Sequence, residues 1–343
     1  MKEFGSDFHF CDYTLLKNTN HLDVFDNVRY YTSGRHALEA IIKQEKWKRI
    51  WIPAYFCYEV IGHISSFGIE VILYDDNPLF IDNYNSISSL NYKSGDVLLR
   101  MNFFGLREKC SNKNISIPVI EDHTHDITSE WSLNSDADWC IASIRKTLPV
   151  AAGGILWSPL KKELPQQITS TNDCEQMADI RYDAMQMKKM YLSKGGDKDA
   201  FRNKYILSEE MIEKLSISGM DKKSFEILTS IDVDNWTSKR KTNWITAYNI
   251  LSDKFNILKP HNIDNFNPFS LIFICNSLED RENLRNYLIK NSIFPAILWK
   301  VPEDTIFDST LDFSNRMLSV HCDARYTKND IEQMCKTITA YYD

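Results

Sequence analysis

A lysine and an acid stand at the ends of two neighbouring apolar runs of this 343-residue sequence. Lys146 follows the run 138–142 and precedes a segment with one proline and two glycines, 147–156, while Asp122 follows the run 117–121. A lysine amine can form a Schiff base with an aldehyde, and a carboxylate can keep a pyridine nitrogen protonated. The pair predicts a site for pyridoxal 5'-phosphate, with an internal aldimine on Lys146.

Lys146 is the predicted catalytic residue. Lysine is rarely placed where it must be partly buried, and removal from water lowers the pKa of its amine towards that of a useful nucleophile. We expect Lys146 to hold the cofactor, to be displaced by an amino donor, and then to act as general base and acid.

Asp122 and His125 are the candidates for orienting the cofactor ring. Ligands of α/β sheets bind at the carboxyl ends of strands, which is where we expect Asp122. Taken alone, Asp122 is better explained as a cap of the next segment, because acids at strand ends are common caps. His125 could face the 3'-oxygen of the ring, but a lone histidine is usually a core or surface residue.

The phosphate needs an anion site, and a serine and a glycine open the first predicted helix. Ser33 and Gly34 would offer a hydroxyl and free N–H groups at a helix start, where the dipole attracts anions. Ser143 is the natural second contact, and Arg35 or Arg145 could add positive charge. The alternative for Ser33 is an ordinary helix cap.

An aromatic segment, 53–58, follows a predicted strand. Tyr55 or Phe56 could stack on the pyridine ring. An aromatic turn that only covers the core is an equally good explanation of either residue.

The elements that must position these residues alternate between strands and helices. Strands separated by helices imply right-handed crossovers and a mainly parallel sheet in a large α/β domain. The clearest predicted strands are 49–53, 70–74, 96–102, 117–121, 139–142 and 154–157, the last a return strand.

The later part of the chain has a different pattern. Residues 172–250 are charged and mostly helical, and an α+β pattern begins near residue 259. We therefore predict an N-terminal segment plus a large cofactor-binding domain, 1–235, and a linking helix plus a small α+β domain, 236–343.

Composition excludes several classes of protein. A net charge of −7 argues against a nucleic-acid binder, whose surface would be basic. Eight cysteines without a CxxC pair favour buried free thiols over disulfides or a metal site. The start of the sequence has no apolar leader, and no apolar stretch is long enough to span a membrane, so we expect a cytoplasmic protein.

The order of these motifs resembles the DegT/DnrJ/StrS family of pyridoxal phosphate-dependent sugar aminotransferases, as a divergent branch. The resemblance covers nearly the whole chain at moderate specificity. It is carried by Ser33-Gly34-Arg35, Pro53-Ala54-Tyr55-Phe56, Glu121-Asp122-His123-Thr124-His125, Ser143-Ile144-Arg145-Lys146, Gly153-Gly154, Lys239–Asn243 and Leu318–Asp323.

The resemblance implies fold type I of pyridoxal phosphate enzymes, the aspartate aminotransferase-like fold, whose large domain has a mainly parallel seven-stranded sheet. It also implies a homodimer with the active site at the subunit interface, glutamate as amino donor, and a keto-sugar nucleotide or related small metabolite as acceptor. By this resemblance, Lys146 would form the aldimine and Asp122 would contact the pyridine nitrogen. Sugar biosynthesis, including that of polysaccharides, is the implied setting.

The sequence departs from the family at three places. Ser143 is three residues before Lys146 instead of five, Arg35 replaces a threonine, and residues 172–215 form an unrelated charged stretch. A non-catalytic regulatory or binding protein is therefore an alternative. A sugar-modifying enzyme other than a transaminase is another, although related dehydratases typically carry histidine in place of the lysine.

Overall fold

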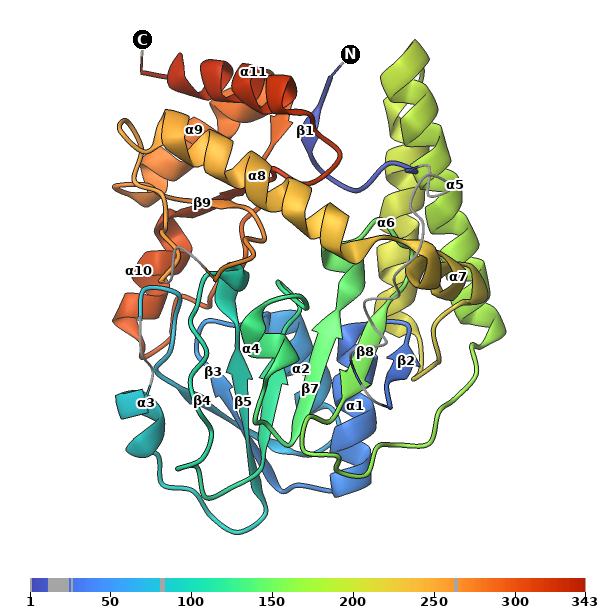
Figure 1. Cartoon of the computed structure of the whole chain (residues 1–343), viewed down its shortest axis with the longest axis vertical. Coiled ribbons are helices and arrows are strands. Elements are labelled where there is room, and N and C mark those ends of the chain that lie inside the picture. The colour runs from blue at the N-terminus through green and yellow to red at the C-terminus, as the bar shows by residue number, and fades with distance from the viewer. Residues whose placement is uncertain (1, 12–24, 26, 81–83, 262–264, 343) are drawn as a thin grey trace.

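The computed structural model describes residues 2–11, 25, 27–80, 84–261 and 265–342. A sheet flanked by helices forms the lower part of the molecule in Figure 1, and a smaller α+β unit lies above it. A long helical pair stands beside both parts.

The main sheet has seven strands in the order β2-β8-β7-β6-β5-β3-β4. The run from β4 to β7 is parallel, whereas β8 is antiparallel to both β7 and β2. A mainly parallel seven-stranded sheet with a return strand is thus confirmed. The strands are β2 Arg29–Tyr31, β3 Arg49–Pro53, β4 Glu70–Tyr74, β5 Asp96–Met101, β6 Val119–Asp122, β7 Trp139–Ser143 and β8 Gly154–Trp157.

The strand register brings the predicted site residues to one edge. Asp122 pairs with Met101 of β5 and with Ile141 of β7, so it lies level with the ends of both neighbours. Lys146 ends a short 3-10 turn, Ile144–Lys146, directly after β7. Consecutive residues of a strand point to opposite faces. Accordingly, Ile120 packs in one core and Val119 in the other.

Helices of the large domain follow the predicted alternation, and the charged stretch becomes a helical hairpin. Helices α5 and α6 pack along each other and, with α7, cover one core of the sheet. The elements are α1 Gly34–Glu45, α2 Tyr58–Ser65, α3 Tyr84–Ser88, the 3-10 turn Phe103–Gly105, α4 Glu130–Leu133, α5 Asn172–Lys194, α6 Lys198–Lys214, α7 Lys222–Ser230 and α8 Val233–Leu251.

The smaller unit follows α8, which crosses above the sheet in Figure 1. Its strands β9 and β11 are antiparallel, and β10 pairs in parallel with β1 from the start of the chain. The N-terminal strand therefore joins the C-terminal unit, while a domain division at 235/236 stays a prediction. The elements are β1 Phe4–Gly5, β9 Leu271–Ile274, α9 Leu278–Lys290, β10 Ile293–Phe294, α10 Asp308–Arg316, β11 Met317–Val320 and α11 Lys328–Thr339.

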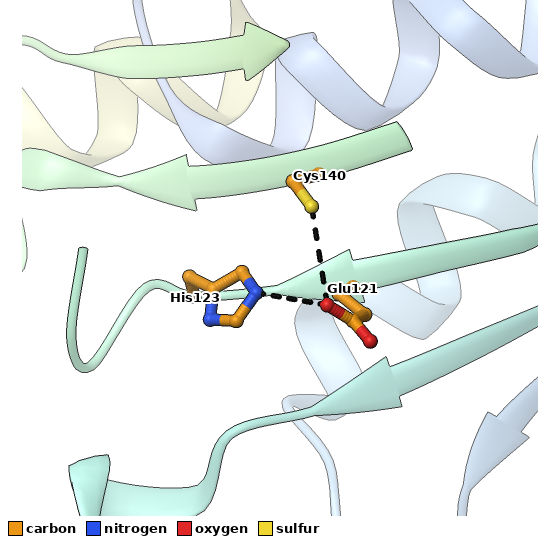
Figure 2. A group of neighbouring side chains, drawn as sticks. All are labelled: Glu121, His123 and Cys140. Carbon is orange, nitrogen blue, oxygen red and sulfur yellow. Dashed lines mark hydrogen bonds and ion pairs between the residues drawn. The ribbon is translucent and has the colours of Figure 1, made fainter. Parts of the chain in front are cut away.

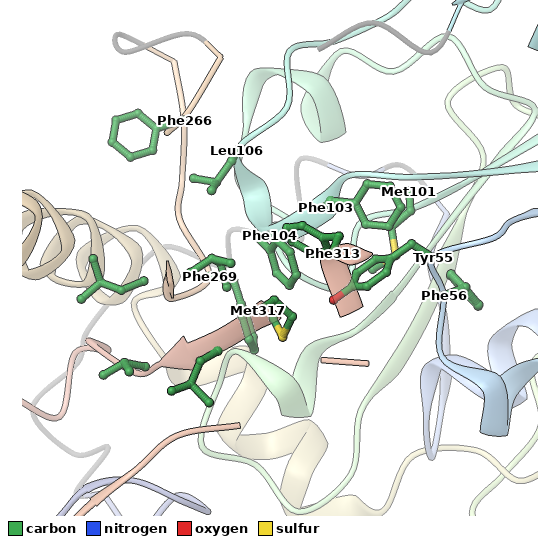
Figure 3. Packing of buried hydrophobic residues seen from close by; sticks show 14 of the residues in the cluster. Tyr55, Phe56, Met101, Phe103, Phe104, Leu106, Phe266, Phe269, Phe313 and Met317 are labelled. Atoms are coloured by element: carbon green, nitrogen blue, oxygen red, sulfur yellow. The ribbon is translucent and has the colours of Figure 1, made fainter. Parts of the chain in front are cut away.

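An aromatic cluster joins the two units at the carboxyl edge of the sheet (Figure 3). The Tyr55 ring lies 5.7 Å from the Phe103 ring and 4.9 Å from the Phe313 ring of α10. Such contacts bury large apolar areas and add roughly 0.5–1.5 kcal/mol per ring pair. The small unit is thereby held against the strand ends that carry Asp122.

None of the helices in the described ranges is both long and apolar enough to cross a membrane.

Candidate active site

Lys146 lies on the wall of a pocket of about 380 Å³ between the sheet edge, the α5–α6 hairpin and the small unit. Lys146 is exposed at this pocket, which is open to solvent. The other lining residues are Ser6, Asp7, Phe8, Arg145, Arg181, Glu209, Phe269, Phe294, Pro295, Ala296, Leu298, His321 and Arg325.

The charge of Arg145, followed by burial, lowers the pKa of Lys146 to about 8. The amine is accessible to the pocket, so we regard the neighbouring guanidinium as the main cause. Sequence reasoning expected the lowered pKa but attributed it to desolvation alone. An amine with this pKa is mainly protonated near physiological pH, but its neutral fraction is far larger than that of an ordinary lysine and can act as a nucleophile.

Asp122 ends β6 as a buried carboxyl group. Its Oδ1 accepts a hydrogen bond of 2.8 Å from Thr124 N, and burial raises its pKa despite that bond. Within the described ranges Asp122 makes no ion pair. A cationic nitrogen beside Asp122 would stabilise the charged form, as a protonated pyridine would.

His125 is buried between the nearly parallel rings of Phe104 and Trp299, at 5.2 and 5.5 Å. Its Nδ1 accepts a hydrogen bond of 3.0 Å from Phe104 N, which places the proton of the neutral ring on Nε2. Burial, helped by Lys146, lowers the pKa of His125 to about 3. The ring is therefore neutral and can donate one hydrogen bond from Nε2.

The start of α1 meets the ends of β7 and β8 closely. A Cβ on Gly34 would lie 3.0 Å from the Cβ of Ser143, and one on Gly154 would lie 2.0 Å from the carbonyl oxygen of Ser33. Only glycine permits this approach. The structure thus brings together Ser33, Gly34 and Ser143, as a phosphate site would require.

Hydrogen bonds at this helix start leave donors for an anion. Ser33 caps α1 by accepting a bond of 3.4 Å from His36 N, which leaves its hydroxyl proton available. The cap interpretation and the phosphate interpretation are therefore compatible. Arg35 lies 3.9 Å from the exposed Glu59, a long ion pair, so its guanidinium could turn towards a phosphate.

Tyr55 and Phe56 are fully buried. Tyr55 donates its hydroxyl hydrogen bond to the carbonyl of Leu298 and packs in the aromatic cluster of Figure 3. Both residues pack in the hydrophobic core, and this favours the covering role that we left open for them. Trp299, which sequence reasoning missed, is the aromatic residue stacked at His125.

Asn102, one residue after β5, is buried beside Asp122, and its backbone N–H donates to the Asp122 carbonyl at 3.1 Å. Both polar atoms of its side chain lack a partner in the described structure. A buried polar group without a partner costs about 1–3 kcal/mol. A polar ligand atom at this edge would remove that cost, which makes Asn102 a further candidate contact.

Glu121 points to the opposite face from Asp122 and forms a buried polar network with His123 and Cys140 (Figure 2). Glu121 Oε2 accepts from Ser135 Oγ at 2.6 Å and lies 3.2 Å from His123 Nε2, and Oε1 accepts from Asn112 at 2.7 Å. Three metal-ligand types meet here, but these donors already satisfy both oxygens of Glu121. We interpret the network as structural.

The first residues of the chain form one wall of the pocket. The backbone carbonyl of Asp7 accepts hydrogen bonds from Lys188 at 2.7 Å and from Arg325 at 3.0 Å, and Tyr205 donates to the Phe8 carbonyl at 2.6 Å. Arg325, which also lines the pocket, is paired with the buried Asp323. It therefore holds the wall as well as facing the pocket.

Pyridoxal phosphate fits these residues. Among the described residues, Asp122 forms no ion pair and the side chain of Asn102 has no hydrogen-bond partner, while Gly34 at the start of α1 lies close against Ser143. Lys146 supplies an amine of lowered pKa on the same side. The donor set matches an aldehyde, a pyridine nitrogen and a phosphate.

Comparisons of the sequence find no matching protein-family model and no matching curated protein. Comparisons of the structure find aminotransferases. PseC of Helicobacter pylori, an aminotransferase involved in the biosynthesis of pseudoaminic acid, is 13% identical with a TM-score of 0.64 over 99% of both chains.

Two further structures are similar over most of their length. Spr1654 of Streptococcus pneumoniae, assigned as a sugar aminotransferase and solved in its PLP form, is 12% identical with a TM-score of 0.64, over 95% of this chain and 91% of its own. A DegT DnrJ EryC1 StrS aminotransferase from Brucella abortus is 11% identical with a TM-score of 0.62, over 95% and 91%. The chain therefore has the predicted fold type I.

Proposed function

We propose that this protein, built on the fold of those enzymes, is a pyridoxal phosphate-dependent aminotransferase. The observation that carries the proposal is the position of Lys146, with its lowered pKa, directly after β7 and at the edge of the sheet where β6 ends in Asp122. Glutamate is the proposed amino donor. The proposed acceptor is a keto-sugar nucleotide or a related small metabolite, since Spr1654 is assigned as a sugar aminotransferase and PseC is involved in the biosynthesis of pseudoaminic acid.

Each candidate residue has a role in this proposal. When bound, the cofactor supplies an aldehyde for the lysine and a ring that withdraws electrons from the substrate. Asp122 holds a positive charge at the ring nitrogen, and His125 donates from Nε2 to the ring oxygen. Ser33, Gly34, Arg35 and Ser143 bind the phosphate.

Lys146 moves the proton. As a neutral amine it would remove a proton from the Cα of the substrate, and as an ammonium it would deliver one to the carbon that the cofactor contributes as its aldehyde. A pKa of about 8 keeps both forms populated near neutral pH, since a general acid–base residue works best when its pKa is close to the working pH.

The test is an absorbance spectrum of the purified protein with pyridoxal phosphate, before and after glutamate. We expect a visible band from the lysine–cofactor adduct that glutamate removes. A band that ignores glutamate would contradict the donor. No band at all would reject the enzyme and favour the non-catalytic alternative.

A second lysine gives a matched control for the nucleophile. Burial lowers the pKa of Lys188 to about 8, like that of Lys146, but its amine is only 1% exposed and donates to the Asp7 carbonyl. Borohydride reduction followed by peptide mapping should label Lys146 and leave Lys188 unmodified. Label on Lys188 would show that the wrong lysine has been assigned.

The assembly and location are also proposals. We propose a cytoplasmic homodimer, which light scattering on the purified protein can test for its subunit number. A monomer that still forms the visible band would show that one chain completes the cofactor site.

A further inference from the structure

The α5–α6 hairpin, which the family pattern did not predict, reaches the Lys146 pocket. Arg181 of α5 and Glu209 of α6 both line it, next to Arg145. Arg145 directly precedes Lys146, so the hairpin contacts the segment that carries the proposed nucleophile.

Both Arg145 and Arg181 donate hydrogen bonds to Glu209. Arg145 bonds both of its oxygens, Nη1 to Oε1 at 2.8 Å and Nη2 to Oε2 at 3.1 Å, and Arg181 Nη1 donates to Oε1 at 2.6 Å. This paired geometry is the one by which arginine recognises carboxylates and phosphates. Although burial raises it, the charges of Arg145 and Arg181 hold the pKa of Glu209 well below its usual range.

The three side chains differ in how far they could move. The side chains of Arg145 and Arg181 are each 9% exposed, whereas that of Glu209 is 41% exposed. Arg181 is also held by Asp7 at 3.1 Å and by Ser208 at 3.2 Å. Glu209 can therefore rotate into the pocket opening while the guanidinium groups stay in place.

Two features indicate that an external anion is expected at this place. The buried Nε of Arg145 has no partner in the described structure. The pocket wall carries four cationic side chains, Arg145, Lys146, Arg181 and Arg325, against the two acids Asp7 and Glu209. If Glu209 moved away, Arg181 would keep its ion pair with Asp7 at 3.1 Å, but the nearly buried guanidinium group of Arg145 would need another anion, because unpaired buried charge is costly.

We propose that Arg145 and Arg181 form an oxyanion-binding site for a reactant and that Glu209 is its internal occupant, displaced when the reactant binds. The oxyanion is either a substrate carboxylate or the phosphate of the cofactor. The identity of these reactants rests on the proposed function, but the anion site itself can be tested without any reaction.

The test compares Glu209→Gln with Glu210→Gln. Glu210 is the adjacent, exposed residue and does not line the pocket. Calorimetry would measure the binding of glutarate, a dicarboxylate that cannot be transaminated, and of pyridoxal phosphate. Neutralising the occupant should tighten one ligand about tenfold or more, because a hydrogen bond to a charged group no longer has to be broken. Glu210→Gln should match the natural protein.

The two ligands distinguish the sources of the anion. If Glu209→Gln binds only glutarate more tightly, the anion is a substrate carboxylate. If it binds only pyridoxal phosphate more tightly, the anion is the cofactor phosphate. Affinity for both that is unchanged or weaker in Glu209→Gln would overturn the inference, since Glu209 would then be a structural clamp. Tighter glutarate without any visible lysine–cofactor band would support the anion site and reject the proposed function.

Discussion

The two faces of β6 carry adjacent acids in opposite states. Glu121 is surrounded by donors, and although burial works to raise its pKa, His123, Arg100 and Ser135 lower it to about 2. Asp122, on the other face, has one neighbouring residue as its donor, and burial raises its pKa. A satisfied buried acid belongs to the scaffold, whereas an under-satisfied one at a strand end is prepared for a ligand.

The largest effect on stability should come from replacing Glu121. Glu121→Ala would leave Asn112, Ser135 and His123 without their acceptor, and breaking such a buried network costs about 3–5 kcal/mol. Urea denaturation measures the loss. A decrease in the free energy of unfolding of less than about 1 kcal/mol would contradict the structural role that we assign to Glu121.

Asp122→Asn should separate activity from stability. Loss of the charge at the proposed pyridine nitrogen should slow the glutamate half-reaction about 10²–10³-fold, the range seen when a preorganised electrostatic contact is removed. The free energy of unfolding should stay within about 1 kcal/mol, because Asp122 makes few native contacts. Stopped-flow absorbance and urea denaturation check the two halves. An unchanged rate of the glutamate half-reaction would show that Asp122 does not contact the cofactor.

The pH dependence of stability should differ in sign for the two acids. Glu121 has a lowered pKa, so its stabilisation is complete above pH 4.5 and is lost as pH falls towards 2, by up to about 3 kcal/mol. Asp122 has a raised pKa, so its ionisation disfavours the folded state as pH rises above 3.8. Denaturation of Glu121→Gln from pH 2 to 5 should show a flatter profile than that of the natural protein. Identical profiles would contradict the assignment.

Cys140→Ser should have the smallest effect. The thiol lies 4.0 Å from Glu121, a weak contact, so a hydroxyl in its place should change stability by about 1 kcal/mol or less. Thermal unfolding with and without a chelator tests this. A chelator-sensitive melting temperature in the natural protein, lost in Cys140→Ser, would show that the network holds a metal.

Much of the proposed active site at the carboxyl edge of the sheet was predictable, because local sequence patterns determine it. Asp122 and Lys146 follow short buried strands, and the carboxyl ends of parallel strands meet at one edge whatever the loops do. The Ser33-Gly34 helix start was predictable for the same reason. The reason for the lowered pKa of Lys146 was not, because it depends on how the Arg145 side chain lies.

Contacts from distant parts of the chain could not be predicted. Trp299 reaches His125 from the small unit, and Arg181 and Glu209 reach Arg145 from the hairpin. Charged helices have no apolar pattern that would reveal which face meets a pocket. The sequence shows that α5 and α6 are rich in charged residues, but it does not show that Arg181 and Glu209 meet at Arg145.

The wall formed by Ser6, Asp7 and Phe8 has a consequence for synthesis on the ribosome. Arg325, which holds them, follows Asp7 by 318 residues in the sequence. At about 5–20 residues per second, the interval between their synthesis is on the order of 15–60 s. The nascent chain therefore carries an open Lys146 pocket until Arg325 has been made, and we expect it to depend on chaperones during that interval.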